Sequence, residues 1–169
     1  MVASDFARLR YFKPENVPAW DKVSFDVVWN LERLVDRVGI RPVIISSWRS
    51  PSKNEAVGGH QNSQHLVGKA LDIWWGGNID LVKVYNLALA QGSFGGIGLY
   101  YPEMTMHLDT GPKNQLGLTR LWSRIGGKTQ PYQAITVALD KLKALVKKID
   151  TDTISSLLWI GIFLSALRR

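Results

Sequence analysis

The sequence predicts an α+β fold, in which a small antiparallel sheet is flanked by helices. Few segments have the periodicity of long helices, and the runs that resemble strands cluster late in the first 125 residues. Strands and helices do not alternate regularly, as they do in parallel α/β proteins. A length of 169 residues allows one domain of ordinary size and a short appendage.

Two segments have the apolar spacing of an amphipathic helix. Residues 22–38 place apolar side chains three and four positions apart, and Gly39 supplies a C-terminal stop. Residues 78–92 form the second predicted helix, with Asn78 or Asp80 as its N-cap and a glycine at its end.

Four segments are predicted to be strands. Residues 41–48 are a short β-branched run, and residues 66–75 resume as a second strand. Residues 94–102 and 104–111 read as a hairpin-like pair. Between the first two strands, residues 49–64 are polar and rich in turn residues, which predicts a long loop with one helical turn. A loop of this length in a compact domain is usually functional or disordered.

Composition excludes several kinds of site. The chain has no cysteine, so disulfides, thiolate zinc sites, iron–sulfur clusters and cysteine nucleophiles are absent. Its formal charge of +7 favours an anionic partner such as nucleic acid, an acidic membrane face or a bacterial cell-wall polymer. The first twelve residues contain no apolar run of signal-peptide length, and we expect no secretory signal.

The C-terminal segment differs from the rest. We expect residues 1–127 to form the main domain, residues 128–131 a linker, and residues 132–169 an amphipathic basic helix followed by an apolar segment. That apolar segment is shorter than the about 20 residues of a bilayer span. It predicts a membrane or virion partner, with packing on the domain as the alternative. The tail's lysines lack interleaved aromatic residues for base stacking, so nucleic acid is not the expected partner.

Candidate metal ligands come from the few histidines. His65 and Asp72 lie seven residues apart across a predicted loop and strand. His107 lies in an alternating strand, where Asp109 shares its face and Glu103 does so if the strand extends that far. Two histidines and one aspartate from separate elements would leave a position for water, as in catalytic zinc sites. Taken singly, each of these residues has an ordinary structural role as the alternative.

The motifs around these residues resemble the metallopeptidases of family M15. The family signature Ser-x-His-x-x-Gly-x-Ala-x-Asp, followed by a distant histidine, is matched by NSQHLVGKALDI and MHLDTG. The matching positions are Ser63, His65, Gly68, Ala70, Asp72 and His107. The chain is most similar to subfamily A, the D-Ala-D-Ala carboxypeptidase-like branch that also occurs in phage lytic proteins. The resemblance covers roughly residues 10–125.

The resemblance implies a zinc peptidase fold, one Zn²⁺ ion, and hydrolysis of peptidoglycan stem-peptide bonds. His65, Asp72 and His107 would be the metal ligands. Arg49, in the motif SWRSP, would hold a substrate carboxylate, for which the planar guanidinium is suited; pairing with an aspartate or glutamate at the surface is the alternative. Ser63 would donate to the substrate backbone.

The acid–base residue is where the chain departs from the family pattern. Many relatives carry a carboxylate three residues before the last ligand, and this position is Met104. Glu103 is the preferred substitute, and Asp109 is the second candidate, either as the base or as a group that orients a ligand. A site without catalytic activity is the remaining alternative.

The resemblance, the domain size and the expected lack of a signal peptide favour a phage-encoded protein. Such a protein would act in the host cytoplasm or the virion, and it would associate with a membrane through residues 132–169. The alternative to an active peptidase is an inactive, zinc-containing module that binds the cell wall or serves in the virion.

Overall fold

The computed structural model describes residues 1–77, 79–101, 103–125 and 128–131, so the predictions for residues 132–169 lie outside it. The first of two compact units runs from Met1 to Gln130. The α+β class predicted from the sequence is confirmed. With 3₁₀ helices labelled η, the elements are η1 (Ala3–Arg8), η2 (Pro14–Asn16), η3 (Trp20–Lys22), α1 (Phe25–Val38), β1 (Val43–Ser46), α2 (Pro51–Ala56), η4 (Gln64–Val67), β2 (Ala70–Trp74), α3 (Leu81–Gln91), β3 (Gly96–Tyr101), β4 (Thr105–Asp109), β5 (Arg120–Ile125) and β6 (Lys128–Pro131).

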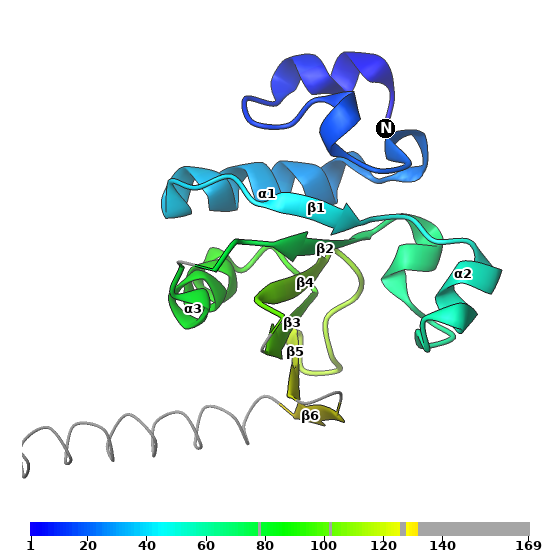
Figure 1. The fold of residues 1–169 in the computed structure, drawn as a ribbon, viewed down its shortest axis with the longest axis vertical. Coiled ribbons are helices and arrows are strands. Elements are labelled where there is room, and N and C mark those ends of the chain that lie inside the picture. The colour runs from blue at the N-terminus through cyan, green and yellow to red at the C-terminus, as the bar shows by residue number, and fades with distance from the viewer. Residues whose placement is uncertain (78, 102, 126–127, 132–169) are drawn as a thin grey trace, which may run out of the picture. The chain divides into compact units, whose positions relative to one another are not determined.

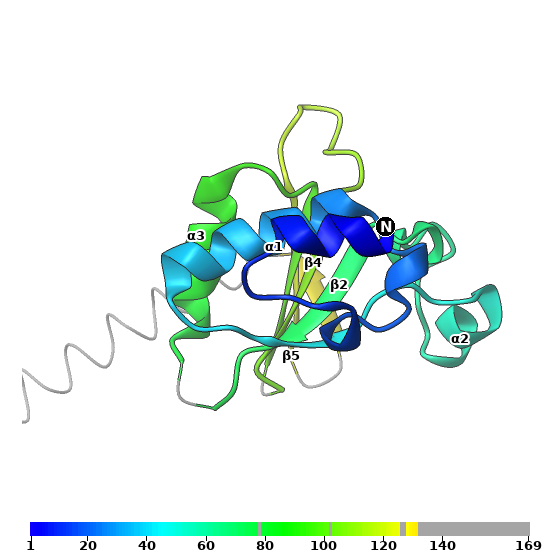
Figure 2. The same cartoon turned by 90° about the horizontal axis from the view of Figure 1, so that it is seen from above.

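The strands form one sheet in the order β1-β2-β4-β3-β5-β6. The β1–β2, β2–β4 and β3–β4 pairs are antiparallel, as predicted for a hairpin-like β3–β4 pair, whereas β3 and β5 are parallel. Figures 1 and 2 show α3 on one side of the sheet and α2 on the other. Residues 128–131, predicted to be a linker, form the edge strand β6.

The helices end where the sequence places a glycine. Gly39 and Gly92 both have left-handed backbone angles, with φ of 77° and 71°, and close α1 and α3. The side chain of Asp80 accepts a hydrogen bond from the backbone of Lys83 at 3.0 Å and caps α3. Helix α1 starts at Phe25 and not at residue 22, because the preceding residues form η3.

The core lies between the sheet and the helices α1 and α3. Alternate positions of β2, β3 and β4 are apolar and at most 1% exposed: Leu71, Ile73, Ile97, Leu99, Met106 and Leu108. This alternation buries one face of each strand and leaves the other face for polar groups. Trp74 and Trp75 point opposite ways, as predicted for neighbours on a strand, and are 44% and 5% exposed.

The N-terminal 3₁₀ helices were not predicted, and one buried carboxylate anchors their segment. Glu32 of α1 is 4% exposed, and its Oε1 accepts backbone hydrogen bonds from Arg10 and from Tyr11, the latter at 2.8 Å. These donors replace water at Oε1 and offset part of the cost of burial, whereas Oε2 is buried without a hydrogen-bond partner among the described residues. No helix in the described ranges has the length and hydropathy needed to cross a membrane.

Polar side chains form three cross-strand rows on the face of the sheet opposite the core. Residues directly opposite each other on paired strands share a face and pack side by side. The central row comprises Asp72, His107, Gly98 and Trp122. The Asp109 row comprises Ala70, Asp109, Gly96 and Arg120, and the Tyr100 row comprises Trp74, Thr105, Tyr100 and Arg124.

Candidate metal centre

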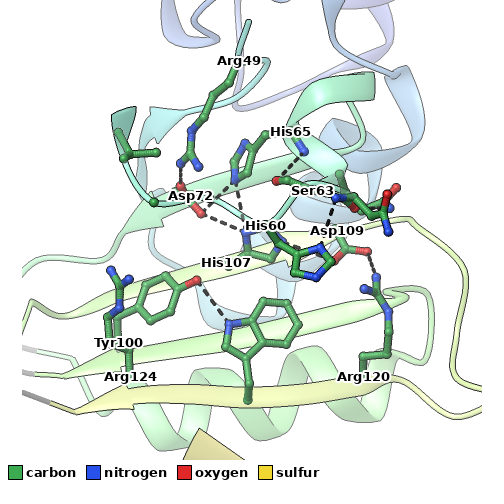
Figure 3. A pocket seen from close by; sticks show the side chains of 16 residues that line it. Arg49, His60, Ser63, His65, Asp72, Tyr100, His107, Asp109, Arg120 and Arg124 are labelled. Carbon is green, nitrogen blue, oxygen red and sulfur yellow. Dashed lines mark hydrogen bonds and ion pairs between the residues drawn. The ribbon is translucent and has the colours of Figure 1, made fainter. Parts of the chain in front are cut away.

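Three candidate ligands meet at the central row. Asp72 of β2 and His107 of β4 are register partners, and His65 reaches them from η4 (Figure 3). Asp72 Oδ1 lies 3.2 Å from His65 Nε2 and 2.9 Å from His107 Nδ1, and the two nitrogens are 3.2 Å apart. Ligands at about 2.0–2.2 Å from a tetrahedral ion are about 3.3–3.6 Å from each other, so only a small expansion of this cluster separates it from a metal site.

In each imidazole, one nitrogen is bonded to a protein acceptor, and this bond determines which nitrogen is available to a metal ion. His65 Nδ1 donates to the carbonyl oxygen of Ser47, and His107 Nε2 donates to Asp109 Oδ2 at 3.2 Å. In neutral rings these bonds leave His65 Nε2 and His107 Nδ1 without a proton. With both rings neutral, three acceptor atoms converge, and a cation between them would relieve their mutual repulsion. Burial lowers the pKa of His107, but hydrogen bonds to Asp109 and Asp72 outweigh it and raise that pKa above its ordinary value, which favours a proton on this ring when no cation is bound. The donor set fits a metal ion, with Zn²⁺ among those it suits.

Asp109 is held from three directions. It is 1% exposed, and besides His107 it accepts hydrogen bonds from Arg120 Nη2 at 2.7 Å and from the backbone of Gly111 at 2.8 Å. Both carboxylate oxygens are engaged. These contacts give Asp109 the geometry of a group that orients a metal ligand.

Burial and hydrogen bonding oppose each other in the pKa values of this cluster. Burial raises the pKa of Asp72, but hydrogen bonds from His107 and His65, when these rings carry protons on the nitrogens that face it, outweigh burial and hold that pKa below its ordinary value. Burial likewise raises the pKa of Asp109, and the hydrogen bond from His107 with the charge of Arg120 brings it below the ordinary range. Both carboxylates are therefore ionised at neutral pH.

The cluster lies in a cavity of about 560 Å³. The loop between α2 and η4 forms one wall, and Tyr100, Trp122 and Arg124 from β3 and β5 form the other. Gly98 is required beneath this second wall, because a side chain there would overlap the indole of Trp122. The Trp122 ring consequently lies 5.0 Å from the ring of His107.

Comparison with known proteins agrees with this geometry. The family model described as Peptidase M15 matches residues 13–109, which is more than half of the chain and contains all three candidate ligands. The chain belongs to the M15 peptidase family. A search of curated proteins found no match. M15 peptidases depend on zinc. In this chain, His65, Asp72 and His107 lie close enough together to hold a metal ion.

Arg49 of this M15 peptidase lies beside a metal ligand. Its Nη2 is paired with Asp72 Oδ2, and its Nε donates to Ser46 Oγ at 3.0 Å. Pairing with Asp72 was the alternative to substrate binding in the sequence prediction. Because Arg49 also lines the cavity, the same guanidinium faces both the ligand carboxylate and the space for substrate.

Ser63 and His60 both line the cavity from the loop wall. Ser63 is the N-cap of η4, and its hydroxyl accepts a bond from the backbone of His65 at 3.4 Å. The Ser63 hydroxyl keeps its own proton for another acceptor. His60 is exposed, as predicted for a loop residue, and its Nδ1 accepts a bond from the backbone of Asn62 at 3.1 Å.

Glu103 of the M15 peptidase does not line the cavity. It is exposed in the turn between β3 and β4, and the strand begins only at Thr105. Met104 has a left-handed φ of 56°, so the alternation that would place Glu103 on the face of His107 stops before reaching it. The structure brings Asp109 to the ligands and leaves Glu103 outside.

Sequence reasoning did not assign Tyr100, Arg120 and Arg124 to the site. They reach the cavity through β3 and through the parallel pairing of β5 with β3. The alternation RLWSR marks β5 as a strand with Arg120, Trp122 and Arg124 on one face. Which strand it pairs with has no local signal.

Proposed function

We propose that this chain is a zinc-dependent peptidase that hydrolyses peptide bonds in the stem peptides of peptidoglycan, as a carboxypeptidase or an endopeptidase. The observation that carries the proposal is the convergence of ligand atoms from His65, Asp72 and His107, with each imidazole fixed through its other nitrogen. Membership of a peptidase family supplies the reaction class.

His65, Asp72 and His107 would hold one Zn²⁺ ion. When bound, zinc acts as a Lewis acid that activates water and polarises the scissile carbonyl. Arg49 binds a carboxylate of the substrate through its guanidinium, releasing part of its contact with Asp72. Ser63 donates its hydroxyl proton to a backbone carbonyl of the substrate.

The charge of the cavity supports an anionic substrate. Three arginines and two aspartates line it, so it carries a net positive charge before any metal is bound. A divalent ion adds to this charge. Stem peptides carry free carboxylates, and the anionic wall also suits the formal charge of +7 on the whole chain.

The acid–base group remains Glu103 or Asp109 in this proposal. Asp109 is near the ligands, but its oxygens are engaged by His107, Arg120 and Gly111. Glu103 has no hydrogen bond or ion pair with another of the described residues, and it would have to approach from the turn before β4. A proton acceptor contributes about 100- to 10,000-fold to such reactions, so the two variants differ measurably from wild type.

The alternative is an inactive zinc-containing module that binds the cell wall or serves in the virion. One observation favours it: the carboxylates that line the cavity among the described residues, Asp72 and Asp109, are both occupied by other groups. Such a module would keep zinc affinity and wall binding without turnover.

Finer features of the proposal rest on the motif resemblance. The chain would belong to subfamily A, the D-Ala-D-Ala carboxypeptidase-like branch, and would be a phage lytic enzyme acting from the host cytoplasm or the virion. Residues 132–169 would associate with a membrane or a virion partner.

Purified cell walls and a chelator test the proposal. The zinc-loaded full chain should release peptides or amino groups from walls, and removal of zinc should abolish release until zinc is restored. Release that continues unchanged in the zinc-free chain would contradict the metal-dependent mechanism. Zinc binding and wall binding without release by the wild type would favour the inactive module.

Two variants then separate the acid–base candidates. Glu103→Gln and Asp109→Asn each remove one charge and keep the size of the side chain. If Glu103 is the base, Glu103→Gln loses activity and retains zinc affinity. If Asp109 is the base, Asp109→Asn loses activity even when saturating zinc compensates for weaker binding.

A further inference from the structure

The three guanidinium groups of the cavity differ in what they contact. Arg49 is paired with Asp72, and Arg120 is paired with Asp109 at 2.7 Å. Arg124 has no ion-pair partner among the residues that the structure describes, although it lines the same cavity. One of the three positive charges is therefore left without an ion-pair partner within the described part of the chain.

Arg124 is exposed and lies against an aromatic ring. Its Cζ is 5.7 Å from the ring centre of Tyr100, its register partner on the parallel strand β3. A cation above an aromatic face keeps its N–H groups directed outward from the ring. The fork of Arg124 is thus positioned by the protein and open to a ligand.

Tyr100 adds a second donor beside it. The Tyr100 hydroxyl accepts a hydrogen bond from Trp122 Nε1 at 3.3 Å, which leaves its own proton for another acceptor. Burial raises the pKa of Tyr100 above its ordinary value, so this hydroxyl stays protonated at neutral pH. Figure 3 shows Tyr100 and Arg124 together on the wall opposite Arg49.

The sheet register sets how far this pair lies from the ligands. Tyr100 and Arg124 belong to the row next to the central row, two residues further along the strands than Gly98 and Trp122. Two strand residues span about 6.6 Å. An extended peptide lying across the ligands would present a group one or two residues from its scissile bond to Tyr100 and Arg124.

We propose that Arg124 and Tyr100 form a second carboxylate-binding subsite, which selects peptides that carry a free carboxylate near the scissile bond in addition to the one bound by Arg49. A planar guanidinium with an adjacent hydroxyl matches the two oxygens of a carboxylate. This inference rests on the proposed function and names the substrate class. Stem peptides whose non-terminal carboxylates are free would be preferred over those in which they are amidated.

The test uses two synthetic stem pentapeptides that end in D-Ala-D-Ala. They are identical except that the carboxylates other than the C-terminal one are free in the first and converted to carboxamides in the second. Binding is measured by titration calorimetry on the full chain without metal, where the peptide is not consumed, and kcat/KM is measured on the zinc-loaded full chain.

Wild type should favour the free peptide by about 10- to 100-fold, the usual effect of a charge-assisted hydrogen bond. Arg124→Gln should lose this preference by weakening only the free peptide. Arg124→Lys should retain part of it, and Tyr100→Phe should reduce it while keeping the ring. Equal affinity for both peptides in wild type, or a preference that survives in Arg124→Gln, would overturn the subsite.

Lys83→Gln is the matched control for charge. Lys83 is exposed on α3, on the side of the sheet away from the cavity, and its loss should leave the peptide preference unchanged. A Lys83→Gln effect equal to that of Arg124→Gln would overturn the subsite in favour of long-range attraction.

The two proposals fail in different ways. Turnover of both peptides with equal kcat/KM would overturn the proposed subsite but would still support the proposed peptidase activity. Absence of turnover, with a binding preference that Arg124→Gln removes, would overturn the peptidase and support the subsite as part of a binding module.

Discussion

Each ligand imidazole is fixed through one of its nitrogens by a protein acceptor, and this decides the chemistry at the residue scale. The carbonyl of Ser47 and the carboxylate of Asp109 each take one N–H, so the remaining nitrogens face Asp72 as acceptors. Histidine ligands commonly have such partners, whose loss weakens metal binding. Asp109 lies two residues after His107 on the same strand, so β4 alone positions both the ligand and its hydrogen-bond partner.

Asp109→Asn should lower the affinity for zinc by about 10- to 100-fold, because a neutral amide holds the His107 N–H less strongly. Competition with a chromophoric chelator measures this affinity. Glu103→Gln, which changes an exposed side chain outside the cavity, should leave it unaltered. A similar loss in both variants would contradict the role of Asp109 as the partner of His107.

Tyr100 should make the protein less stable in alkali. Burial raises its pKa in the folded chain above the value of about 10 in the unfolded chain. Between those two values the unfolded state binds fewer protons than the folded state, so the free energy of unfolding falls as the pH rises. Denaturant unfolding from about pH 9 to pH 11 should show a steeper fall for wild type than for Tyr100→Phe. Parallel curves would show that the folded protein does not disfavour ionisation of Tyr100.

At the scale of elements, a glycine sets how η4 meets the rest of the domain. Gly68 closes η4 with φ of 69°, and its carbonyl oxygen accepts a hydrogen bond from the backbone of Ser24 at 2.8 Å. A side chain at Gly68 would overlap the carbonyl oxygen of Lys22. The element that carries His65 is therefore held against the segment before α1 by a contact that only glycine allows.

Gly68→Ala should lower the free energy of unfolding by more than about 2 kcal/mol, since left-handed strain adds to a clash with backbone. Gly39→Ala is its matched control. Gly39 also has a positive φ, but an added methyl group meets nothing within 4 Å, so about 1 kcal/mol of strain is expected. Chemical denaturation of both variants measures the difference. Equal losses would show that the close approach to Lys22 contributes nothing.

Elements with a regular local pattern could be predicted from the sequence. The apolar spacing before Gly39 predicted α1, and alternation around His107 predicted β4. The three N-terminal 3₁₀ helices were missed because turns of three to six residues have no long apolar period. Residues 128–131, which were predicted to be a linker, form strand β6, and their sequence Lys-Thr-Gln-Pro gives no sign of the pairing that forms it.

At the scale of the whole molecule, a bound ion would connect three separate parts of the chain. The ligands come from η4, β2 and β4, and 42 positions separate His65 from His107. An ion that binds only the folded arrangement stabilises it in proportion to the logarithm of its concentration. The metal would therefore act on folding as well as on catalysis.

Zinc at about 100 times its dissociation constant should stabilise the full chain by about 2.7 kcal/mol. For a chain of this size that corresponds to a rise in Tm of about 5 to 11 °C. Calorimetry with and without zinc measures the rise, which Asp72→Asn should abolish. Asp36→Asn changes an aspartate on α1, outside the cavity lining, and should keep the full rise. A rise that persists in Asp72→Asn would place the ion elsewhere.

The metal ligands could be predicted from spacing and motif, but the opposite wall of the cavity could not. His65 and Asp72 are close in sequence, and His107 belongs to a strand whose alternation is visible. Arg124 and Trp122 enter the cavity because β5 pairs in parallel with β3, after a connection that leaves β4 and passes across the end of β3 at Gly96. Such long-range pairing depends on the packing of the whole domain, and no local pattern encodes it.

The division of the cavity between strands bears on how such a protein diversifies. The ligands lie on η4, β2 and β4, whereas Trp122 and Arg124 lie on β5, a strand that carries no ligand. Substitutions at Trp122 and Arg124 can therefore change what the cavity accepts without replacing a metal ligand or the Arg120–Asp109 pair that supports His107. Under the proposed function, related proteins that act on cell walls with different amidation could differ in specificity through substitutions on β5 alone.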